Sequence, residues 1–200
     1  MPFFYPESAQ TRAQNTAKQG AQKTMAQLIE RNGFKEYSKQ TAELLQTLPE
    51  SYTAYSGAAR AMMGSGITEF VVVGPTGIFS LQTAQDAGRY KGPSADRYLF
   101  FSKPGDKSVK QVKNPLNAAV TDATAVSTAL RKNGLGISFA YAAYFPNATE
   151  EPDITHNARV SVSVFTKGQD LLAFILKGGT ALSADEVAAV RRVIEALPQR

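Results

Sequence analysis

The sequence contains no cysteine and no tryptophan, and its only histidine is His156. The absence of cysteine excludes disulfide bridges, thiolate metal centres and cysteine nucleophiles. One histidine cannot supply a metal site built from several imidazoles. No apolar run approaches the ~20 residues that a membrane-spanning helix needs, and the first residues lack the basic and then apolar pattern of a secretory signal. These absences predict a cytoplasmic protein that does not insert into a membrane.

What the sequence does contain is typical of one folded domain with a short extension. Its 200 residues are 43% hydrophobic and 20% charged, which is too apolar for a disordered chain. The formal net charge of +5 favours anionic partners weakly. Residues 9–24 are rich in Ala, Gln and Thr and show no apolar stripe. We therefore expect an N-terminal helical arm over 1–38, ordered against a partner, and a domain over 39–200.

Hydrophobic spacing and turn residues predict alternating helices and strands. Helices are expected over about 25–32, 39–48, 114–132, 170–176 and from 184 onwards. Asn114 and Pro115 form a typical helix start, and residues 183–186 form a capping box. Strands are expected over 69–73, 78–81, 97–101, 137–145 and 159–165, the first two joined as a hairpin by the turn at 74–77. The order predicts a mixed α/β domain in which residues 71–73 form a covered, central strand.

The hairpin segment 69–81, EFVVVGPTGIFSL, resembles the nuclease-related domain (NERD) family. Residues 71–77 repeat the family's V-V-V-G-P-T-G, and Gly88 stands where the family has a later glycine. Residues 114–116 are similar to its N-P-L helix start, residues 139–148 to its next strand, and residues 171–175 and the last helix to its closing segments. The resemblance covers about 39–197. It implies a restriction-endonuclease-like αβββαβ core, extended here by the N-terminal arm and by C-terminal helices.

The resemblance also indicates where catalytic residues would lie. In active relatives, an Asp on the first hairpin strand and the Glu and Lys of an E-x-K motif on the next hold a divalent cation and activate water. These positions fall on Glu69, Gln82 and Ala84. Only Glu69 keeps a carboxylate, and one carboxylate holds Mg²⁺ poorly among phosphodiester charges. We expect a degraded site with no assigned catalytic residue, no cofactor, and no metal ligand other than Glu69.

A basic segment follows the hairpin. Residues 89–113 carry seven cations against two acidic residues, an excess equal to the net charge of the whole chain. The cations expected to bind nucleic acid are Arg89, Lys91, Arg97, Lys103, Lys107, Lys110 and Lys113. The aromatic residues among them are Tyr90, Tyr98, Phe100 and Phe101. Cations contact phosphates and rings stack on bases, and about five such contacts would lower affinity roughly 10²–10³-fold between 50 and 200 mM salt. The alternative is a loop of solvated lysines with the rings in the core.

Three functions remain open at this point. The first is a nuclease-like domain without hydrolytic activity that serves as an accessory module and binds DNA or a protein. The second is a divergent Mg²⁺-dependent nuclease that uses Glu69 and a relocated cation; Asp86, Arg89 and Lys91 are the charged residues that closely follow the degraded motif. The third is a structural subunit of a larger assembly, which contacts a protein partner through the N-terminal arm.

Overall fold

The computed structural model of the chain describes residues 36–56, 69–84, 86–156 and 161–197. The predicted helix at 25–32 and residues 1–35 of the predicted arm lie outside the described residues, as does the beginning of the strand predicted over 159–165. The described part is a mixed α/β fold with two mixed sheets. The first described helix, α2 (Glu36–Leu45), crosses the boundary that the sequence placed between 38 and 39.

The main sheet has five strands in the order β1-β2-β3-β7-β9. They are β1 (Thr53–Ser56), β2 (Phe70–Gly74), β3 (Gly77–Thr83), β7 (Phe139–Tyr144) and β9 (Val162–Phe165). β2 runs antiparallel to β1 and β3, whereas β3, β7 and β9 are parallel. Every residue of β2 and β3 is buried, which confirms the predicted hairpin and its covered position in the sheet.

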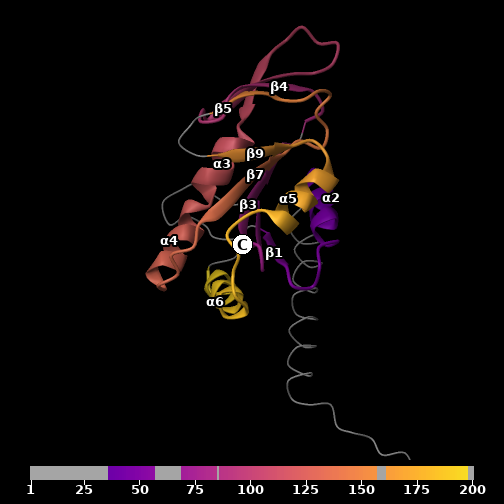
Figure 1. The fold of residues 1–200 in the computed structure, drawn as a ribbon. Helices are drawn as coiled ribbons and strands as arrows, with labels where there is room; N and C mark the ends of the chain where they lie inside the picture. Colours follow the sequence, from indigo (N-terminus) through magenta and orange to yellow (C-terminus); the bar gives the residue numbers. More distant parts are fainter. Residues whose placement is uncertain (1–35, 57–68, 85, 157–160, 198–200) are drawn as a thin grey trace, which may run out of the picture.

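A second sheet has the order β6-β5-β4-β8 and lies beyond one end of the main sheet (Figure 1). Its strands are β4 (Arg89–Pro93), β5 (Tyr98–Ser102), β6 (Lys110–Lys113) and β8 (Asp153–Thr155). The strand predicted over 97–101 is therefore confirmed as β5, but it belongs to this second sheet. The third strand beside the hairpin is instead β1, whose four half-buried residues show no alternation that the sequence could reveal.

Helices cover both faces of the main sheet (Figure 1). They are α2, α3 (Pro115–Asp122), α4 (Thr124–Lys132), α5 (Gly168–Lys177) and α6 (Ala184–Glu195). The helix predicted over 114–132 is divided into α3 and α4 at Ala123, whose ψ of −13° departs from the usual helical value. The predicted capping box is present at the start of α6, where Ser183 and Glu186 exchange hydrogen bonds.

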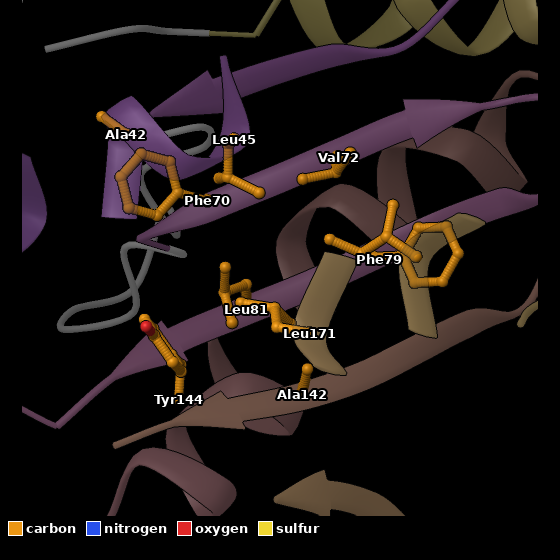
Figure 2. Close-up of a cluster of buried hydrophobic side chains, with 10 residues drawn as sticks. Ala42, Leu45, Phe70, Val72, Phe79, Leu81, Ala142, Tyr144 and Leu171 are labelled. Carbon is orange, nitrogen blue, oxygen red and sulfur yellow. The ribbon is translucent and has the colours of Figure 1, made fainter. Parts of the chain in front are cut away.

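Strand alternation divides the core between the two faces of the main sheet. On one face, α2 and α5 cover Phe70 and Val72 of β2 and Phe79 and Leu81 of β3, as Figure 2 shows. On the other face, α4 and α6 cover Val71, Val73 and Ile78. A third cluster joins the inner face of the second sheet to α3 and β7; it contains Tyr90, Leu99, Phe101, Leu116, Ala119, Ala143 and Phe145.

The Gly-Pro-Thr-Gly turn between β2 and β3 is held by packing. A Cβ on Gly74 would lie 2.1 Å from the Tyr52 ring, so only glycine permits this contact. Gly77 has a φ of +134°, which disfavours any other residue. The Thr76 hydroxyl donates to the Ile175 carbonyl at 2.6 Å, which ties the turn to α5. The turn residues that carry the family resemblance thus have structural roles here.

Asn114 joins the second sheet to α3. The residue is fully buried, and its Oδ1 accepts the Leu116 backbone N–H at 2.9 Å as an N-cap. Its Nδ2 donates to the carbonyls of Pro93, Ser94 and Asp96 at 3.0, 3.2 and 2.7 Å. Because these carbonyls belong to the turn between β4 and β5, one side chain fixes that turn against the start of the helix.

We expect Asn114→Ala to lower the free energy of unfolding by about 2–4 kcal/mol, because it removes the cap and the amide donor shared by three buried or part-buried carbonyls. Asn117→Ala is the matched control, since the Asn117 amide donates to the Ala95 carbonyl at an exposed position; it should cost less than about 1 kcal/mol. Urea denaturation followed by circular dichroism measures both. Equal effects would contradict the role assigned to Asn114.

Candidate functional site

The hairpin places Glu69 and Gln82 at one end of the main sheet. Phe70 of β2 pairs with Leu81 of β3, so Glu69 precedes and Gln82 follows the last paired residues of the two strands. The Glu69 carboxylate accepts the backbone N–H of Thr83 at 2.6 Å. This hydrogen bond orients one carboxylate oxygen toward the β3 backbone.

Gln82 donates a hydrogen bond to a buried carboxylate, Asp122, that was not among the site residues predicted from the sequence. The Gln82 Nε2 donates to Oδ2 of Asp122 at 3.2 Å, and Nζ of Lys113 lies 3.1 Å from the same oxygen. Asp122 is only 6% exposed although it carries a charge. The available signal was a charged residue within the apolar stripe of the helix predicted over 114–132. Its partners come from β3 and β6, and Gln82 lies 40 residues away in sequence.

Ala84 is surrounded by apolar side chains. It is buried in the third cluster with Tyr90, Leu99 and Phe101. A lysine at this position would have to bury its charge or displace these side chains, and both are unfavourable. The position to which the resemblance assigns a lysine therefore has a packing role in this chain.

We call the end of the hairpin that carries Glu69, Gln82 and Ala84 the Glu69–Gln82 corner. The side chains at this corner do not fit a magnesium site. Glu69 supplies a carboxylate, but one of its oxygens is bound to the β3 backbone, Gln82 directs its amide nitrogen at Asp122, and Ala84 has no ligand atom. Mg²⁺ is usually held by one or two carboxylates together with waters and substrate phosphates. Here the Glu69 carboxylate accepts a backbone N–H, and the Asp122 carboxylate already binds Gln82 and Lys113. Across the residues that the structure describes, no three histidine, aspartate or glutamate side chains are grouped so as to hold a metal ion.

The charged residues just after the hairpin lie elsewhere. Arg89 and Lys91 are exposed in β4 rather than in a loop, and Asp86 pairs with Lys110 at 3.4 Å. The hydrogen bond and the charge of Asp153 raise the pKa of Lys91, which keeps it cationic. The cation that reaches Gln82 and Asp122 is Lys113.

The second sheet has one covered and one solvent-facing side. Tyr90, Leu99 and Phe101 point inward and are almost fully buried. Tyr98 and Phe100 point outward from β5 and are 44% and 51% exposed. Strand alternation therefore separates the four aromatic residues of the basic segment into two in the core and two on the surface. Burial also raises the pKa of the Tyr90 phenol, whose hydroxyl donates to the Asp86 carbonyl.

We call the solvent-facing side of this sheet the outer face. Lys91 of β4 pairs with Phe100 across the sheet, and on the other side Phe100 pairs with Gln111 of β6. Tyr98 pairs with Lys113, and the Arg97 guanidinium lies 5.5 Å from the centre of the Tyr98 ring. The two exposed rings thus have cations beside them on neighbouring strands.

Ion pairs reduce the charge of the basic segment. Four cations bind carboxylates: Arg89 with Glu150 at 3.0 Å, Lys91 with Asp153 at 2.9 Å, Lys110 with Asp86 at 3.4 Å and Lys113 with Asp122 at 3.1 Å. Arg97, Lys103 and Lys107 form no ion pair with another described residue. Together with Asp96 and Asp106, seven cations face six carboxylates, so the local excess is one positive charge.

Comparison with protein-family models, with curated proteins and with solved structures finds no match to this chain. Within the described ranges, every helix is too short or too polar to cross a bilayer. Inferences about function therefore depend on the geometry described above.

Replacing Gln82 by glutamate tests whether the missing charge is what prevents cation binding. We expect Gln82→Glu to lower the free energy of unfolding by about 1–3 kcal/mol, because the new carboxylate faces the Asp122 carboxylate. Mg²⁺ or Mn²⁺ should then raise the melting temperature of this variant and leave the wild type unchanged.

The control is Gln82→Leu, which removes the hydrogen bond to Asp122 without adding charge and should not respond to metal. Thermal unfolding with and without the cation measures all three proteins. A metal-dependent rise in the wild type itself would contradict the conclusion that this corner does not fit a divalent cation.

Proposed function

We propose that the chain is a nuclease-like domain of the NERD type that lacks hydrolytic activity and binds nucleic acid through its second sheet. The observation that carries the proposal is the outer face, where the basic segment displays two exposed aromatic rings with cations on the adjacent strands. Such a surface suits phosphates and bases together.

The order of the elements supports a restriction-endonuclease-like scaffold. α2, the three strands β1, β2 and β3, then α3 and β7 follow the αβββαβ order, with most of the second sheet inserted between β3 and α3. The corner formed by Glu69 and Gln82 corresponds to the catalytic position that the family resemblance implies. The Glu69 carboxylate, the Gln82 amide and the Ala84 methyl group offer few ligands for a catalytic metal ion. We therefore favour a binding function over hydrolysis.

A divergent nuclease is the second candidate, because Asp122 and Lys113 bring an acid and a lysine to Gln82. We expect purified protein with Mg²⁺ or Mn²⁺ to cleave neither single-stranded nor double-stranded DNA above a chelator control. Gel analysis of labelled substrates tests this. Cleavage that disappears in Glu69→Ala would favour the nuclease and overturn our proposal of a non-hydrolytic module.

Nucleic-acid binding should depend on salt and on the three cations that form no ion pair with another described residue. If Arg97, Lys103 and Lys107 contact phosphates, duplex affinity falls by about 40-fold between 50 and 200 mM salt. We expect reversal of all three charges to glutamate to abolish most of this dependence. Fluorescence anisotropy with labelled 20-nucleotide DNA, single-stranded and duplex, measures it.

The matched control reverses three exposed cations outside the second sheet, Arg131 and Lys132 at the end of α4 and Lys177 at the end of α5. It changes net charge equally and should lower affinity much less. No binding to either DNA at 50 mM salt would refute nucleic-acid binding, and equal losses in both triple variants would refute the assignment of the interface to the second sheet.

A further inference from the structure

We propose that the outer face binds single-stranded nucleic acid, and that unpaired bases stack on Tyr98 and Phe100. This inference rests on the proposed function and specifies its ligand. It also assigns a role to the two rings, which contribute little to the core of the domain.

The exposure of these rings is unusual for this chain. Four large hydrophobic side chains are strongly exposed among the described residues: Tyr98, Phe100, Val109 and Leu176. The two aromatic ones share a strand and a face, whereas their neighbours Leu99 and Phe101 are almost fully buried in the third cluster. Adjacent exposed apolar side chains on a soluble surface indicate a site of interaction.

The spacing of the rings favours a single strand. Residues two apart in a strand are separated by about 6.6–6.8 Å, which is roughly twice the 3.4 Å rise of stacked bases in a duplex strand. Bases in a duplex are covered on both faces by their neighbours, so a flat ring on a sheet cannot reach them. A single strand can separate successive bases and place one on each ring.

Polar side chains lie beside the two rings, where the sugar-phosphate backbone of a bound single strand would run. Lys91 and Gln111 flank Phe100 on the two neighbouring strands, and Lys113 lies opposite Tyr98. The Arg97 guanidinium already occupies a position over the Tyr98 ring, where cation–π attraction holds it. A base that stacks on Tyr98 takes this position, and the displaced guanidinium then lies within reach of the adjoining phosphate.

Charge argues against a second copy of the chain as the occupant. The segment keeps an excess of positive charge, and Arg97, Lys103 and Lys107 lack carboxylate partners among the described residues. Two such faces in contact would bring together two surfaces with the same sign of excess charge and would gain no electrostatic complementarity. A polyanion with flat apolar groups complements both the cations and the rings.

The test compares binding of oligo(dT) and of a mixed-sequence duplex by Tyr98→Val and Phe100→Val, measured by fluorescence anisotropy. Valine fits a strand but has no aromatic face. We expect each substitution to weaken oligo(dT) binding about tenfold and duplex binding less than about twofold. Leu176→Ala, an exposed apolar truncation on α5, should change neither.

A further variant, Phe100→Trp, keeps an aromatic ring at this position and introduces the only tryptophan of the chain. It should bind oligo(dT) as tightly as the wild type, with quenching of its fluorescence as bases stack on the indole. Far-ultraviolet circular dichroism and urea denaturation establish that each variant is folded before its affinity is compared.

The outcomes separate this inference from the proposed function. Equal binding of duplex and oligo(dT), unaffected by either valine variant, would overturn stacking while nucleic-acid binding survives. Oligo(dT) binding without quenching of Phe100→Trp would also overturn it. No binding of any DNA by the wild type at 50 mM salt would overturn both. If light scattering shows that the wild type is a dimer and the valine variants are monomers, the rings serve a protein interface and the inference is wrong.

Discussion

The arrangement of the two sheets depends on one buried amide. Asn114 caps α3 and binds three carbonyls of the turn between β4 and β5, so the orientation of the second sheet is fixed by the helix that packs on β3 and β7. Lys113, the residue before Asn114, forms an ion pair with Asp122. The same Asp122 oxygen accepts a hydrogen bond from Gln82. A short polar path through α3 therefore connects the second sheet with the Glu69–Gln82 corner, beside the apolar contacts of the third cluster.

The residues that resemble the NERD family are mostly those that shape the hairpin. Gly74 admits the Tyr52 ring, Gly77 adopts a positive φ and Thr76 binds α5. These requirements are independent of chemistry at the end of the strands. At the other end, Gln82 donates a hydrogen bond to Asp122 and Ala84 lies among apolar side chains. Packing alone accounts for the turn residues, so the resemblance at the turn bears on the scaffold more than on an activity.

Local signals allowed some elements to be predicted, and non-local pairing hid the others. The hairpin, the Asn114 cap and the capping box at Ser183 are each specified within a few residues. β1, β6 and β8 are three or four residues long and become strands only by pairing with distant partners. β4 ends in Gly92 and Pro93, two residues that disfavour a strand prediction. Asp122 was equally hard to predict as a site residue, because Gln82 and Lys113 approach it from β3 and β6. Alternation implied that Phe100 and Phe101 face opposite ways, but only the packing of α3 beneath the sheet determines which ring is exposed.

The ion pairs of the outer face bear on our proposal that it binds a single strand. Duplex affinity comes chiefly from neutralising closely spaced phosphates, and only three cations of the segment form no ion pair with another described residue, which limits that gain. Arg89 and Lys91 pair with Glu150 and Asp153 at exposed positions, where such pairs contribute little and break easily. A phosphate can replace one of these carboxylates, but the displaced acid remains nearby and repels a dense second strand. Stacking on Tyr98 and Phe100 carries no such electrostatic penalty and needs only flat, unpaired bases. The balance of charge and exposed ring area therefore favours a single strand over a duplex.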